Sequence, residues 1–173
     1  MQNNAESFLA VTVQTFRGMK NLGERAMAQL DDHHFHIRLD PESNSLEQLI
    51  LHLHGNMISR WTDWLKTDGE KPDRDRDGEF EDAGLSRAEL EQRWQEGWDC
   101  LFNALASITD SDLGRIVTIR GEPHTALQAI QRQVSHYAYH VGQIVFLAKH
   151  FKSRDWKTLS IARGQSKSFR PGV

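Results

Sequence analysis

Cysteine and proline are scarce in this sequence, which has one cysteine, Cys100, and four prolines among its 173 residues. A single cysteine cannot form a disulfide within the chain, so the fold does not depend on the cross-links typical of small secreted domains. A reducing compartment is the simplest location for such a chain, and we expect it to be cytoplasmic. The few prolines leave long stretches in which a helix can continue without a break.

Long hydrophobic runs and an excess of positive charge are also missing. No apolar run approaches the ~18 residues that a membrane span requires, so we expect no association with a membrane. Residues Met1 to Glu6 have no basic stretch leading into an apolar core, and we expect no secretion signal. The net charge is −3, so nucleic acid is not an expected partner. The hydrophobic content of 38% still suffices for a folded core and excludes a disordered chain.

Apolar residues recur at helical spacing over most of the chain, and we expect an all-α fold in a single domain spanning residues 1–173. The first helix is predicted from about Glu6 to Leu30. Ser45 and Gln48 form the pattern of a capping box, which opens a second helix that continues to about Lys66.

Two further helices are predicted in the second half of the chain. Ser86 and Glu89 form another capping box, which opens the third helix. The fourth helix is predicted after Pro123 and continues to about Phe151. Before it, Arg115–Arg120 is the one short segment with strand-like alternation.

The link between the second and third helices, Thr67–Leu85, is long and highly charged. A short loop forces neighbouring helices to be antiparallel, whereas a link of this length permits a crossover, so we expect a bundle other than a simple up-down-up-down one. Its segment Asp73–Gly78 resembles the opening of a calcium loop, but the closing glutamate is missing, and we interpret the link as solvated. Arg74 and Arg76 within it could fold over a cleft and meet an anionic ligand.

Histidine is unusually frequent, with nine residues, and two of them fall four apart on the predicted fourth helix. His136 and His140 therefore project from one helix face about one turn apart, close enough for both to reach one metal ion. Such a pair also occurs on solvated faces, so a metal site needs a third ligand. Tyr137 follows His136, so the glutamate that serves zinc proteases as a general base is missing.

The second helix offers two candidates for the third ligand, His52 and His54, which point nearly opposite ways because they are two residues apart. Its apolar arc comprises Leu46, Ile50, Met57, Trp61 and Trp64. His54 falls inside that arc, whereas His52 shares a polar seam with Asn56, Ser59 and Asp63. Burial favours His54 as a core histidine, while a metal cleft would be lined by a polar seam, so periodicity leaves both open. The remaining histidines fall at helix ends or in turns: His33, His34, His36, His124 and His150.

Two motifs together resemble the DinB/YfiT-like superfamily. They are Ser45-Leu-Glu-Gln-Leu-Ile-Leu-His52-Leu on the second helix and His136-Tyr-Ala-Tyr-His140-Val-Gly-Gln143 on the fourth. The segments His52–Lys71 and Leu159–Ser166 resemble one branch of it that is carried as a domain of unknown function. The resemblance covers nearly the whole chain, and its three-histidine combination is more specific than either motif alone.

This resemblance implies a DinB/YfiT-like four-helix bundle with a long crossover between helices two and three. It also implies that His52, His136 and His140 hold one divalent metal ion. Three imidazoles suit several ions, including iron and manganese, and zinc or nickel is the expectation. Three neutral ligands leave open coordination positions, as in catalytic rather than structural zinc sites.

The function implied by the resemblance is a metal-dependent enzyme, because characterised relatives include transferases that join low-molecular-weight thiols to electrophiles. We expect a thiol S-transferase active in detoxification on a small-molecule substrate, with Asn56, Arg60 or Gln143 positioning the substrate or supporting the ligands. One alternative is a metal-dependent hydrolase, for which Asp63 is the nearest candidate base. Another is a non-catalytic, stress-associated metal-binding dimer.

A homodimer is expected because the second helix is apolar over a wider arc than one core contact requires. Trp61 and Leu65 extend this arc outward on the predicted helix.

Overall fold

The computed structural model describes residues 7–168, and four long helices dominate this part of the chain. They are α1 (Phe8–Met27), α2 (Leu46–Trp61), α3 (Arg87–Ala106) and α4 (Ala126–Lys152). Three short 3-10 helices lie in the connections, η1 (Asp32–His36), η2 (Gly78–Phe80) and η3 (Asp110–Asp112), and a fourth, η4 (Ser153–Asp155), follows α4. The strands β1 (Ile116–Ile119) and β2 (Glu122–Thr125) form a small antiparallel sheet. Among the described helices, none is both long and apolar enough to cross a membrane.

Capping boxes fix the starts of three helices. The Ser45 side chain accepts the backbone N–H of Gln48 at α2, and Ser86 accepts that of Glu89 at α3, as the sequence predicted. Thr125 begins α4 in the same way. Each cap satisfies backbone donors that the first turn of a helix leaves without partners.

The ends of the helices differ somewhat from the predictions. The predicted start of the first helix, Glu6, lies outside the described residues, and α1 ends at Met27. Helix α2 ends at Trp61 and does not continue to Lys66, because Thr62 is already extended and Asp63 takes a positive φ of 47°. Asp63 is consequently an exposed residue beyond the helix.

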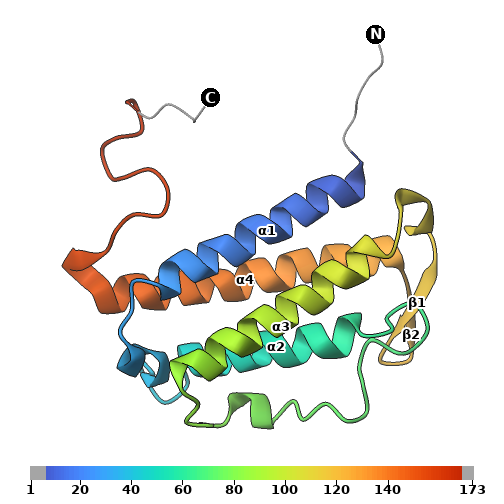
Figure 1. Ribbon diagram of the computed structural model, residues 1–173, viewed down its shortest axis with the longest axis horizontal. Coiled ribbons are helices and arrows are strands. Elements are labelled where there is room, and N and C mark those ends of the chain that lie inside the picture. The colour runs from blue at the N-terminus through green and yellow to red at the C-terminus, as the bar shows by residue number, and fades with distance from the viewer. Residues whose placement is uncertain (1–6, 169–173) are drawn as a thin grey trace.

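The link between α2 and α3 returns along the molecule before α3 begins. In Figure 1, α2 and α3 therefore run in the same direction, while α1 and α4 both run in the opposite one. Helix α2 packs mainly against α3, and α1 packs mainly against α4. Further contacts join α2 to α4 and α1 to α3, so the four helices enclose a common core. The crossover that the length of the link permits is present.

Aromatic side chains fill the centre of this core. Phe16, Trp98 and Tyr137 are fully buried and lie within 5.8 to 6.3 Å of one another, measured between ring centroids. The Trp61 indole donates a 3.0 Å hydrogen bond to the Tyr137 hydroxyl and is only 2% exposed. The argument that Trp61 extends an outward-facing apolar arc was therefore wrong, because its own chain covers it. The homodimer stays a prediction that light scattering can test.

The β-hairpin anchors the charged link near the start of α4. The segment predicted as strand-like, Arg115–Arg120, contains β1, whereas its partner β2 was not predicted because Pro123 lies within it. The Asp68 carboxylate accepts the backbone N–H groups of Arg120 and Gly121, both at 2.8 Å. These bonds hold the link against the hairpin turn. Arg120, in this turn, lies beside the space between α2 and α4.

Candidate metal centre

Three imidazoles from two helices converge on one point. The Nε2 atom of His136 lies 3.2 Å from that of His52 and 3.1 Å from that of His140. With metal–nitrogen bonds of ~2.1 Å, such separations correspond to ligand–metal–ligand angles of roughly 95–100°. The three nitrogens can therefore hold one divalent ion on one side and leave its other side open. The structure thus brings together the three histidines that the resemblance implied as ligands.

A different acceptor orients each imidazole through its Nδ1 atom. His52 Nδ1 lies 2.9 Å from Oε2 of Glu79, on the link. On α4, Nδ1 of His136 and His140 lie 3.2 and 2.8 Å from the side-chain oxygens of Gln133 and Gln143 respectively. Because these oxygens accept hydrogen bonds, each Nδ1 carries the proton and each Nε2 directs its lone pair to the common point. Converging lone pairs repel one another unless a cation lies between them, so the donor set fits a metal.

Burial keeps the imidazoles of His136 and His140 neutral, as metal ligands must be. His52 and His140 are 4% and 5% exposed. Burial lowers the pKa of His136 to about 3, and the neighbouring charges of His140, His52, Arg74 and Arg132 act in the same direction. Burial likewise lowers the pKa of His140 to about 4. Neither side chain needs to lose a proton at neutral pH before it binds a cation.

Glu79 is the residue that sequence reasoning missed most clearly, because the link was interpreted as solvated. It is 8% exposed and binds the Arg74 guanidinium through two hydrogen bonds of 2.7 and 2.8 Å. Burial raises the pKa of Glu79, but hydrogen bonds from Arg74 and His52 outweigh this effect and hold it below its ordinary value. Phe80 stacks on His52 with 4.9 Å between ring centroids. The link is therefore a wall of the site, and Arg74 and Arg76, which the sequence suggested could fold over a cleft, both line a cavity there.

Gln133 was missed as well, although it stands three residues before His136, the spacing that drew attention to Gln143 after His140. On a helix, residues three apart are neighbours, so this signal was available. Gln143 itself supports His140 and does not line the adjacent cavity.

A cavity of about 270 Å³ opens beside the imidazoles of His52 and His136. Asn56 and Arg60, the other predicted site residues, both line it. Asn56 accepts a 3.0 Å hydrogen bond from the Tyr137 hydroxyl, which fixes its orientation. The remaining lining residues are polar or cationic: Arg74, Arg76, Arg120, Arg132 and Gln133. Asp63, the candidate base for hydrolysis, does not line the cavity.

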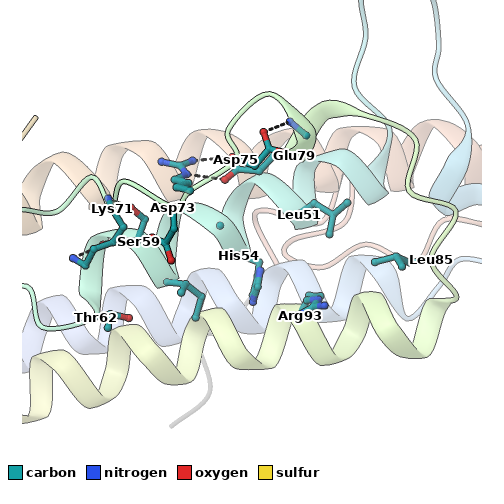
Figure 2. A pocket seen from close by; sticks show the side chains of 14 residues that line it. Leu51, His54, Ser59, Thr62, Lys71, Asp73, Asp75, Glu79, Leu85 and Arg93 are labelled. Atoms are coloured by element: carbon teal, nitrogen blue, oxygen red, sulfur yellow. Dashed lines mark hydrogen bonds and ion pairs between the residues drawn. The ribbon is translucent and has the colours of Figure 1, made fainter.

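His54 lies on the other side of α2, where a second cavity of about 520 Å³ is found. Figure 2 shows the His54 side chain directed from α2 toward α3, close to Arg93. Its Nε2 atom lies 3.3 Å from a carboxylate oxygen of Glu96 on α3. Arg74 lines both cavities and Glu79 lines only the second, so the Arg74 side chain lies between the two spaces.

A second group with metal-ligand chemistry, Asp31, His33 and His34, lies after α1. Asp31 and His33 are exposed, and Nδ1 of His34 accepts the backbone N–H of Asp31 at 3.1 Å. The group therefore lies at the start of η1, where Asp31 is the N-cap residue.

Comparisons with known proteins supply a family but no activity. No curated protein matches the chain. A crystal structure titled as the conserved protein of a locus from Enterococcus faecalis is similar to it, with a TM-score of 0.65 and 14% sequence identity over 84% of this chain and 97% of that one. At this identity the likeness concerns the fold alone. The model of the protein family of unknown function DUF1572 matches residues 3–165, nearly the whole length of the sequence. The chain therefore belongs to the DUF1572 family.

Proposed function

We propose that this protein is a metal-dependent enzyme of the DinB/YfiT-like superfamily that transfers a low-molecular-weight thiol to an electrophilic small molecule. The observation that carries the proposal is the set of three converging imidazoles beside an accessible cavity, with Nε2 of His136 3.2 Å from that of His52 and 3.1 Å from that of His140. The four helices with a long α2–α3 crossover support the superfamily assignment. A divalent ion at this site would supply a Lewis acid that lowers the pKa of a bound thiol.

The absence of a carboxylate from the lining of the cavity favours thiol chemistry over hydrolysis. Among residues 7–168, the groups that line it are histidine, arginine, asparagine and glutamine side chains. The carboxylate nearest to the ligands, Glu79, is already engaged by His52 and Arg74. A thiol transfer needs no separate base once the thiol is ionised, whereas water attack usually does.

The rival proposal is a metal-binding protein without turnover. A fourth protein ligand would close the coordination sphere and favour that rival. Within the described residues, only the three histidines form the group of potential ligands at this point. Two of them, His52 and His136, line the cavity, which supports catalysis.

Elemental analysis of untagged protein, followed by a thiol-conjugation assay, tests the proposal. With a small thiol and a chloronitroaromatic electrophile, a carbon–sulfur bond forms, chloride leaves with the electron pair of the carbon–chlorine bond, and the thiol proton passes to solvent. We expect about one divalent ion per chain and conjugation above that of His140→Ala, which loses one ligand. Metal-loaded protein that conjugates no faster than His140→Ala across a panel of thiols and electrophiles would favour the non-catalytic rival.

A further inference from the structure

The cavity beside the three imidazoles carries an unusual concentration of positive charge. Five guanidinium groups line it, from the link, α2, the hairpin turn and α4: Arg60, Arg74, Arg76, Arg120 and Arg132. Two carboxylates pair with members of this set, Glu70 and Glu79. The cavity therefore holds more cations than its own anions neutralise, before any divalent ion is counted.

Arg60 is the most informative member of this set. It is 5% exposed, and its Nε and Nη1 atoms have no hydrogen-bond partner within residues 7–168. Its remaining nitrogen, Nη2, lies 3.6 Å from Glu70, too far for a hydrogen bond. Leaving buried donors of a charged group without partners is costly, and in folded proteins such donors are normally satisfied by other protein groups, water or a bound ion.

Glu70 cannot neutralise Arg60 by itself, because three arginines share it. Arg74 and Arg120 lie 3.2 and 3.3 Å from its two oxygens, both closer than Arg60. Arg76 and Arg132 are exposed, and no hydrogen bond or ion pair is found for either within the described residues. Both guanidinium groups are therefore available to a ligand that enters the cavity.

From this arrangement we infer that the cavity binds the oxyanion group of a small-molecule substrate, a carboxylate or a phosphate, with Arg60 as the buried contact and Arg132 and Arg76 at the entrance. Arginine recognises both groups through the same paired N–H donors. His52 and His136 line the same cavity, so the anionic group would hold the rest of the substrate beside the open side of the metal site. The substrate class rests on the proposed function, whereas the binding of the anion does not.

The test is calorimetric titration of the full chain with inorganic phosphate and, separately, with succinate at constant ionic strength. Four variants accompany the wild type. Arg60→Gln and Arg132→Gln remove cavity charges, and Arg25→Gln removes an exposed charge on α1 that does not line the cavity. His140→Ala removes a metal ligand without altering the lining of the cavity.

We expect wild type, Arg25→Gln and His140→Ala to bind at least one of the two anions with similar affinity. Affinity should fall roughly tenfold or more in Arg60→Gln and several-fold in Arg132→Gln, since each loses a charge-assisted contact. The exposed position of Arg132 keeps the test decisive if Arg60→Gln does not fold. Stronger binding of phosphate or of succinate identifies which oxyanion the cavity prefers.

Three results would overturn the inference. The first is that the wild type binds neither anion. The second is that Arg60→Gln and Arg132→Gln bind the anion as tightly as the wild type. The third is binding that disappears in His140→Ala but survives in Arg132→Gln, which would locate the anion on the metal ion. Metal content is measured on the same samples. A wild type that binds phosphate through its arginines but contains no metal would contradict the proposed function alone.

Discussion

The two sides of α2 carry histidines two residues apart that have different surroundings. On one side, His52 is held at Nδ1 by Glu79, and its Nε2 faces His136. On the other side, His54 Nε2 lies 3.3 Å from a carboxylate oxygen of Glu96, and His54 lines a larger cavity between α2, α3 and the link. Both histidines approach a carboxylate, so a carboxylate neighbour does not distinguish them.

The two histidines differ in which ring nitrogen contacts the carboxylate. In His52 the carboxylate takes one nitrogen and leaves the other directed at two further imidazoles. In His54 the nitrogen farther from the backbone, Nε2, is the one in contact with the carboxylate. A histidine becomes a metal ligand when its surroundings fix one nitrogen as donor and collect other ligands around the second.

The largest expected effect is on metal content in alanine variants of these two residues. His52→Ala should abolish tight metal binding, because two imidazoles on α4 are too few to hold the ion alone. His54→Ala should leave the stoichiometry unchanged and affect only stability or association. Elemental analysis of both purified variants checks this. Metal retained in His52→Ala but lost in His54→Ala would show that the ligand assignment is wrong.

A smaller effect on metal affinity is expected when the carboxylate beside His52, that of Glu79, is replaced. Glu79→Gln should lower metal affinity roughly 10–100-fold, since it weakens the group that orients His52. Glu96→Gln is the matched control on the other side of α2 and should leave affinity unchanged. Competition titration with a chromogenic chelator measures both. Equal affinities in the two variants would mean that the Glu79–His52 hydrogen bond does not tune the site.

Substitutions at Gly55 and Gly97 allow the two sides of α2 to be compared through changes in side-chain packing. A Cβ on Gly55 would lie 2.0 Å from Oε1 of Glu79, so Gly55→Ala should displace Glu79 and reduce metal affinity several-fold. On the side of His54, a Cβ on Gly97 would meet Met57 Sδ at 3.1 Å and the His54 backbone at 3.3 Å. Gly97→Ala should change thermal stability only. The same chelator titration, with thermal denaturation alongside, separates these outcomes.

The smallest expected effect is on the thermal stability of the whole fold. Removing the metal should lower the melting temperature by about 5–10 °C, the shift expected when a ligand well above its Kd is withdrawn. The helical circular dichroism at 25 °C should persist, because the apolar core does not include the three histidines. The shift should be retained in His54→Ala and absent in His52→Ala. Unfolding of the wild type by chelator at 25 °C would instead indicate a structural metal.

Local rules made much of the scaffold predictable. The caps at Ser45 and Ser86 were visible because a capping box needs only residues three apart. The pairing of His136 with His140 followed from helix geometry, which places residues four apart on one face. The end of α2 was not predictable in this way, since the positive φ of Asp63 interrupts a sequence that remains apolar through Trp64 and Leu65.

By itself, then, the sequence determined the helices, the histidine pair on α4 and the two candidates on α2. Only the tertiary structure showed that His52 faces the pair on α4 while His54 faces Glu96, because helical periodicity gives the direction of a side chain but not what lies opposite it. The same holds for Glu79 and Arg60, whose roles depend on a link that folds back against α2 and the hairpin. Charged side chains in a link are normally solvated, and only the return of this link along α2 buries Glu79 against His52.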